Sequence, residues 1–250
     1  MAMNYGGIII RQLDIEKKGR QYFASGAYDY YMELVEDGAW MEITELQSYT
    51  VYVLYAPEES SILSADSQIM MVQGDVLQVE LQTIRLNVVG ASVRFLVSGV
   101  SKSHAILPYF NVTHYEEIYK VKKPWGHELW LNGEHPAYSF KQVALMAGLR
   151  TSLQYHQMKQ ETNILFEGEA YIHYKSNQDV PNDAVLDTDI DRVQISPISS
   201  VDVVPKVIHR VESITDILLY ETSTPYLDDV IRIADDNNRH HGRIKSEHGG

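Results

Sequence analysis

Four polar side chains in the second half of the chain could together hold a metal ion. Gln154 and His156 are two positions apart, so on a β-strand they project from the same face. Glu161 follows five residues later, beyond an expected turn, and can return to the same cavity from the next strand. Imidazole, carboxylate and amide oxygen suit a divalent transition metal such as zinc, manganese or iron. The predicted fourth ligand is His209.

Each of these residues, taken alone, also has an ordinary structural explanation. His156 could be a strand histidine satisfied by one hydrogen bond, and Gln154 an unremarkable polar strand residue. Glu161 could be a turn carboxylate. Their order and spacing favour a shared metal site over four unrelated roles.

The same spacing resembles the cupin superfamily. Residues 148–168 fit the pattern G-x5-(H/Q)-x-H-x4-E-x6-G, and Pro205 followed by His209-Arg210 matches the second motif P-x3-H-R. Most cupins have a histidine where this chain has Gln154. The resemblance implies a jelly-roll barrel that binds one metal ion through the four predicted ligands.

Further landmarks resemble the cupin domain of the type II phosphomannose isomerases. These are the glutamine in the first ligand position, Pro124-Trp125-Gly126, the S-L-Q-x-H segment at 152–156, and a D-D-x-x-R-x-x-D segment at 228–235. The resemblance covers residues 120–240. It implies a mannose-6-phosphate isomerase type of activity within nucleotide-sugar and polysaccharide precursor metabolism.

An aldose–ketose isomerase moves a proton between two neighbouring carbons through an enediol. A divalent cation would polarise the carbonyl and stabilise the enediolate. The resemblance implies that Arg232 and Lys141 hold anionic oxygens, although Arg232 could instead pair with nearby aspartates and Lys141 could be an exposed strand lysine. Glu221 is the candidate base that we carry forward, and His173 is a second candidate.

Two departures from the isomerase pattern leave the substrate open. Thr162-Asn163 stands where the family has His-Trp, and the chain lacks the glycine-rich loop of the nucleotidyltransferase that usually precedes this domain. The expected ligand is therefore a phosphorylated sugar or a nucleotide sugar. A cupin iron(II) oxygenase and a non-catalytic sugar-binding or regulatory cupin remain as alternatives.

The elements that must position these residues are predicted to be strands. β-Branched and aromatic residues with glycine turns between them favour an all-β fold of two tandem jelly-roll barrels, 1–112 and 113–250. The first barrel is expected to be a degenerate cupin without a metal site, because no histidine precedes His104. Its predicted strands are residues 41–46, 49–56, 75–81, 83–90 and 93–100.

Two segments of the second half are expected to lie outside its strands. Residues 176–197 are polar and acidic, which is typical of a solvated loop. The polar tail from Asn237 onward is expected to fray, with His240 and His241 exposed to solvent.

Composition bounds the remaining possibilities. The chain has 250 residues, no cysteine and a net charge of −13. Thiolate ligands and disulfides are thus excluded, and general binding to nucleic acid or an anionic membrane is disfavoured. The N-terminus has no basic region followed by a long apolar run, so we expect a cytoplasmic protein. We also expect a homodimer, because cupin-like barrels commonly pair through strands.

Overall fold

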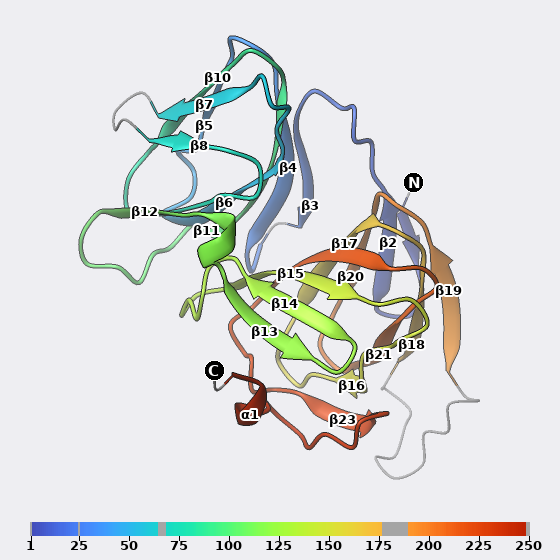
Figure 1. Ribbon diagram of the computed structural model, residues 1–250. Coiled ribbons are helices and arrows are strands. Elements are labelled where there is room, and N and C mark those ends of the chain that lie inside the picture. The colour runs from blue at the N-terminus through green and yellow to red at the C-terminus, as the bar shows by residue number, and fades with distance from the viewer. Residues whose placement is uncertain (1, 25, 65–68, 177–189, 249–250) are drawn as a thin grey trace. The chain divides into compact units, whose positions relative to one another are not determined.

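The structure is a computed structural model that describes residues 2–24, 26–64, 69–176 and 190–248 (Figure 1). Antiparallel strands dominate it, and the chain divides into two compact units. We call residues 14–119 with 131–140 the N-terminal unit, and residues 1–13, 120–130 and 141–250 the C-terminal unit. None of the described helices is long and apolar enough to cross a membrane.

The N-terminal unit contains two antiparallel sheets. The larger has the strand order β12-β9-β6-β11-β4-β3, and the smaller has the order β5-β10-β7-β8. Their bounds are β3 (Gly19–Ala24), β4 (Asp29–Val35), β5 (Trp40–Glu42), β6 (Ser48–Tyr55), β7 (Ser61–Ser64), β8 (Met70–Met71), β9 (Val76–Glu80), β10 (Arg85–Val89), β11 (Val93–Val100) and β12 (Tyr109–Thr113).

Strand alternation builds the core of this unit. Along β6, Tyr49, Val51 and Val53 point to one side and join a cluster of buried apolar side chains contributed by both sheets. Ser48 and Thr50 point to the opposite face and are also buried. The predicted strands of the first half correspond to β5, β6, β9, β10 and β11.

The C-terminal unit also contains two antiparallel sheets. One has the order β1-β2-β20-β17-β22-β15-β14-β13, and the other has the order β19-β18-β21-β16-β23. The bounds are β1 (Ala2–Asn4), β2 (Ile8–Gln12), β13 (Tyr119–Lys123), β14 (Gly126–Trp130), β15 (Ser139–Leu145), β16 (Leu153–Tyr155), β17 (Glu161–Glu167), β18 (Ala170–Ser176), β19 (Asp191–Ile195), β20 (Ser199–Val203), β21 (Val207–Ser213), β22 (Ile217–Ser223) and β23 (Ile231–Ala234). A single-turn helix, α1 (Lys245–His248), follows.

The two units are not contiguous along the chain. β2 pairs with β20 of the C-terminal unit, and Ile8 and Ile10 are buried in that unit's core. Residues 131–140, which comprise the turn between β14 and β15 and the first two residues of β15, group with the N-terminal unit. The boundary predicted at residue 112 lies near one crossing of the chain, but the prediction did not include this exchange of segments.

Two expectations for the second half need correction. Within the stretch 176–197, residues 191–195 form β19, with Val193 half-buried and Ile195 buried; residues 177–189 lie outside the described residues. The tail does not fray as expected over its described part, because Arg239 and Glu247 form ion pairs there. His240 and His241 are exposed, as predicted.

Candidate metal centre

Three strands of the C-terminal unit bring the predicted ligands together. Gln154 on β16 pairs directly with His209 on β21, so the two side chains are cross-strand neighbours. His156 follows β16 by one residue, and Glu161 is the first residue of β17. The loop of residues 157–160 therefore separates His156 from Glu161 and lets both face one cavity.

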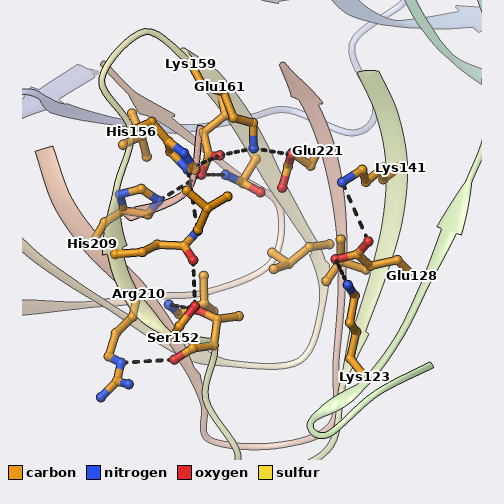
Figure 2. Close-up of a pocket in the computed structure, with 18 of the residues that line it drawn as sticks. Lys123, Glu128, Lys141, Ser152, His156, Lys159, Glu161, His209, Arg210 and Glu221 are labelled. Carbon is orange, nitrogen blue, oxygen red and sulfur yellow. Dashed lines mark hydrogen bonds and ion pairs between the residues drawn. The ribbon is translucent and has the colours of Figure 1, made fainter. Parts of the chain in front are cut away.

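The histidine and glutamate side chains converge (Figure 2). His209 Nε2 lies 3.2 Å from Glu161 Oε1, and His156 Nε2 lies 3.6 Å from Glu161 Oε2. One ligand atom from each of the three residues lies within 4.8 Å of the others. All three side chains are buried. Two imidazoles and a carboxylate at this spacing form a group that could hold a divalent metal ion.

Backbone carbonyl groups orient both imidazole rings. His156 Nδ1 lies 2.5 Å from the carbonyl oxygen of Asp229, and His209 Nδ1 lies 2.9 Å from that of Val207. A carbonyl oxygen only accepts, so each Nδ1 carries the proton in these contacts. Nε2 of a neutral ring then keeps its lone pair, as a metal ligand requires.

Gln154 lies at the edge of this group. Its Oε1 accepts a hydrogen bond from the Ser152 hydroxyl at 2.6 Å, and its Nε2 is 3.5 Å from His156 Nε2. A half-turn of the amide exchanges the two atoms, which lets Nε2 donate to Ser152 while Oε1 faces the histidines. The Gln154 amide can thus present an oxygen to the centre without losing its contact with Ser152.

A buried lysine links the metal group to a second carboxylate. Lys159 Nζ lies 2.6 Å from Glu161 Oε2 and 2.8 Å from Glu221 Oε1. Asn163 on β17 donates to Glu161 Oε1 at 3.2 Å and pairs across the sheet with Glu221 on β22. Only 7% of the Lys159 side chain is exposed, so its charge is balanced by these carboxylates rather than by water.

These contacts set the protonation states of the metal-free centre. Burial alone would raise the pKa of Glu161, but the Lys159 ammonium and the nearby imidazoles hold that pKa well below its ordinary range. Burial and the charge of Lys159 lower the pKa of His156 to about 3. Burial opposes protonation of His209 too, yet the adjacent Glu161 carboxylate raises the His209 pKa above its ordinary value.

A second charged group lines another part of the cavity (Figure 2). Glu128 on β14 lies 3.6 Å from Lys141 Nζ and 3.8 Å from Lys123 Nζ, and it accepts a hydrogen bond from the Trp130 indole at 2.9 Å. Lys141 Nζ also lies 4.4 Å from the centre of the Trp130 ring. Burial would raise the pKa of Glu128, but the two lysines lower it to about 2.

The cavity has a volume of about 140 Å³ and is rich in cations. Among the described residues that line it, seven are lysine or arginine and three are glutamate. This is an excess of four positive charges in a chain whose net charge is −13. The C-terminal segment contributes Arg239 and Arg243, and Glu247 just beyond them pairs with Lys123 at 2.6 Å.

The structure brings most of the predicted site residues into this one cavity. Lys141, Glu221 and Arg232 line it together with Gln154, His156, Glu161 and His209. Arg232 sits across from Gln154 on the neighbouring strand β23, and its guanidinium donates to the carbonyl groups of His240 and Gly242.

His173, the second candidate base, is not among the described residues that line the cavity. Its Nε2 lies 2.6 Å from Glu212 Oε2, with which it forms an ion pair when protonated. Of the two candidate bases, Glu221 alone faces the metal group.

The sequence analysis missed Lys159, Glu128 and the arginines of the C-terminal segment. Alternation gave a usable signal for Glu128, because it precedes Trp130 by two positions and therefore shares its face on the observed strand β14. Lys159 lies in a loop, where no periodicity predicts its direction. Arg239 and Arg243 lie in a polar tail, and nothing in its composition indicates that it packs against the barrel.

Comparison with known proteins finds similarity in fold and not in sequence. No family model matches the sequence, and the sequence matches no curated protein. Among solved structures, protein YlbA from E. coli gives a TM-score of 0.66 at 7% identity, over 90% of this chain and 94% of that chain. Oxalate decarboxylase from Lactobacillus farciminis gives 0.60 at 9%, over 93% and 86%. Salicylate 1,2-dioxygenase from Pseudaminobacter salicylatoxidans gives 0.57 at 11%, over 79% and 71%.

These neighbours have the cupin fold, so the predicted class is confirmed: the chain is an all-β protein built from two cupin-like jelly-roll barrels. At such low identity the likeness extends to the fold and not to the reaction. The C-terminal unit adds a buried His/Glu/His group that could bind a metal ion.

Proposed function

We propose that the protein is a metal-dependent isomerase of a small phosphorylated sugar, of the mannose-6-phosphate isomerase type. The observation that carries the proposal is one cavity that combines a His/Glu/His group, a lysine–carboxylate pair and an excess of cations. These are the three requirements of the reaction: a metal site, a group that can move a proton, and a positive surface for a phosphate.

The donor set fits a divalent cation. His156, His209 and Glu161 would hold it, with the Gln154 amide as the fourth ligand. Both Nδ1 atoms are occupied by backbone carbonyl groups, which leaves the two Nε2 atoms for coordination. When bound, the ion would act as a Lewis acid toward a substrate carbonyl. Zinc, manganese and iron(II) all suit this mixture of nitrogen and oxygen ligands.

Glu221 is the residue that we assign to proton transfer. Its carboxylate faces the cavity beside Glu161 and is held at one oxygen by Lys159. A carboxylate in that position would take the proton from one substrate carbon and return it to the next. Lys159 would keep the carboxylate oriented through their 2.8 Å contact.

The lysine and arginine side chains that line the cavity would bind the phosphate group of the substrate. Lys141 and Arg232 line the cavity on strands other than those of the metal group, joined by Arg239 and Arg243 from the C-terminal segment. Arginine and lysine donors of this kind bind phosphate oxygens by charge-assisted hydrogen bonds. The cavity of about 140 Å³ is smaller than the roughly 300–1,000 Å³ of sites that enclose drug-sized ligands, which favours a monosaccharide phosphate over a nucleotide sugar.

The direct test is solvent-proton exchange. Metal-loaded protein incubated with hexose and pentose phosphates in D2O should incorporate deuterium at the carbon next to the carbonyl, detected by NMR. Glu221→Gln should retain the metal and lose exchange, whereas His156→Ala should lose both. Absence of exchange and of isomer formation with every sugar phosphate tested would refute the proposal.

An iron(II) oxygenase is the second candidate, because one structural neighbour is a salicylate 1,2-dioxygenase with the same fold. Oxygen consumption by iron-loaded protein, with no deuterium incorporation, would favour that assignment. Stoichiometric binding of a sugar phosphate without any conversion would favour a non-catalytic binding cupin.

A further inference from the structure

The short loop between β16 and β17 sets the spacing of two proposed metal ligands. His156 lies at its start, Glu161 begins the strand at its end, and the four residues 157–160 span the gap. Lys206 N donates to the His156 carbonyl group at 2.7 Å, which fixes the backbone at the start of the loop. Any change in the path of this loop would alter the distance between the imidazole and the carboxylate.

One aspartate holds this loop from another part of the chain. The Asp229 carboxylate accepts hydrogen bonds from three successive backbone N–H groups: Gln157 at 3.0 Å, Met158 at 2.6 Å and Lys159 at 3.0 Å. Consecutive amides that converge on one anion form a compact and specific clamp. Asp229 belongs to the segment between β22 and β23, about seventy positions from the loop in sequence.

The same residue also contacts the metal group directly through its backbone. The carbonyl oxygen of Asp229 accepts the Nδ1 proton of His156 at 2.5 Å. Asp229 therefore fixes the His156 ring with its main chain and the loop that leads to Glu161 with its side chain. Two of the three buried ligands depend on the position of this single residue.

We propose that Asp229 is a positioning residue of the metal centre, which holds His156 and Glu161 at the separation that one divalent cation requires. The inference rests on the proposed metal site but not on the proposed reaction. It differs from an ordinary turn-stabilising role in its consequence: a residue that only caps the loop affects stability, whereas a positioning residue also affects metal affinity and ligand geometry.

Three variants separate these roles. Asp229→Asn keeps the backbone carbonyl group and the side-chain shape, but its NH2 group faces N–H donors and cannot accept from them. Asp229→Glu keeps the charge and displaces the carboxylate by one methylene group. Asp228→Asn is the matched control, because it makes the same charge change one residue away, where the side chain is 79% exposed.

The measurement is titration of metal-free protein with Co²⁺, followed by the visible absorption of the bound ion. Loss of a partner that orients a ligand typically weakens metal binding about 10- to 100-fold. We expect that loss in both Asp229 variants, together with altered Co²⁺ bands, and we expect unchanged affinity and bands in Asp228→Asn. Wild-type affinity and bands in Asp229→Asn would overturn the inference.

Hydrogen exchange of the wild-type protein tests the same coupling without substitution. If Asp229 links the loop to the metal, metal binding must in return strengthen the loop's hydrogen bonds. The amides of Gln157, Met158 and Lys159 should exchange more slowly in metal-loaded protein than in metal-free protein. Equal exchange rates would refute the inference even if the Asp229 variants did not fold. Failure of the wild-type protein to bind Co²⁺ would instead refute the metal site itself.

Discussion

Replacement of Lys159 by methionine should make the protein less stable and its metal binding tighter. The Lys159 ammonium lies between two carboxylates, 2.6 Å from Glu161 and 2.8 Å from Glu221, and the three side chains are only 7%, 6% and 15% exposed. In metal-free protein this ammonium is the nearest fixed positive charge to Glu161, so its removal takes away the largest charge that compensates this buried carboxylate. Methionine has a similar length and no charge, which limits the change in packing.

The size of both effects follows from that burial. Breaking a buried ion pair by removing one partner costs about 3–5 kcal/mol, which for a chain of this size lowers the melting temperature by roughly 6–20 °C. In metal-loaded protein the bound cation would compensate Glu161, and the remaining loss is the partner of Glu221, about 1.5–3 kcal/mol. The substitution therefore destabilises the metal-free protein by about 2 kcal/mol more than the metal-loaded protein. This difference increases the metal affinity by roughly 10- to 100-fold.

Equilibrium unfolding with and without metal, together with calorimetric titration of the metal, measures both quantities. Lys123→Met is the matched control: its side chain is 9% exposed and pairs with Glu247, but it does not contact Glu161. This control should lose stability and keep the wild-type metal affinity. If Lys159→Met binds the metal no tighter than the wild-type protein, Lys159 does not compensate Glu161 and the electrostatic account is wrong.

Two further predictions concern protons and the C-terminal segment. The pKa of His156 falls from 6.5 to about 3 on folding. This shift contributes on the order of 5 kcal/mol to the free energy of unfolding above pH 6.5, and the contribution is lost as the pH falls toward 3. The raised pKa of His209 contributes to the free energy of unfolding below pH 6.5, and this contribution is lost as the pH rises. Protons also compete with a metal ion for the His209 imidazole. Urea unfolding should therefore show that metal-free protein becomes less stable as the pH is lowered below 6.5. Metal titrations should show that the metal affinity decreases as the pH is lowered. Glu247→Gln should release Lys123, which pairs with Glu247 at 2.6 Å, and should strengthen the binding of inorganic phosphate several-fold in calorimetry. An unchanged phosphate affinity would show that Glu247 does not compete with phosphate for Lys123.

Local sequence spacing was sufficient to predict that Gln154, His156 and Glu161 face one cavity. Gln154 and His156 share a face because a strand has a period of two, and Glu161 returns after a short loop. Local spacing could not place His209, because its pairing with Gln154 joins residues far apart in sequence, and the resemblance of its motif to that of a known family supported its choice. The strands were predictable for the same local reason, namely runs of β-branched and aromatic residues.

Long-range pairing explains what the sequence could not predict. β2 reads as an ordinary strand at the start of the chain, and only its pairing with β20 assigns it to the C-terminal unit. β19 has just Val193 and Ile195 as inward apolar residues within an acidic stretch, which is too weak a pattern to be distinguished from a loop. In both cases the partner strand, not the local sequence, decides the structure.

The charge balance of the cavity also depends on long-range pairing, and it would couple binding of a metal ion to folding of the whole C-terminal unit. Lys159, Glu221 and Arg239 come from a loop, a strand and the C-terminal segment, and only Glu221 was a candidate in the sequence. They become a site only when the barrel closes, because burial then forces the charges to compensate one another. A cation bound among them would therefore stabilise the closed barrel over any state in which the C-terminal segment or β22 is detached.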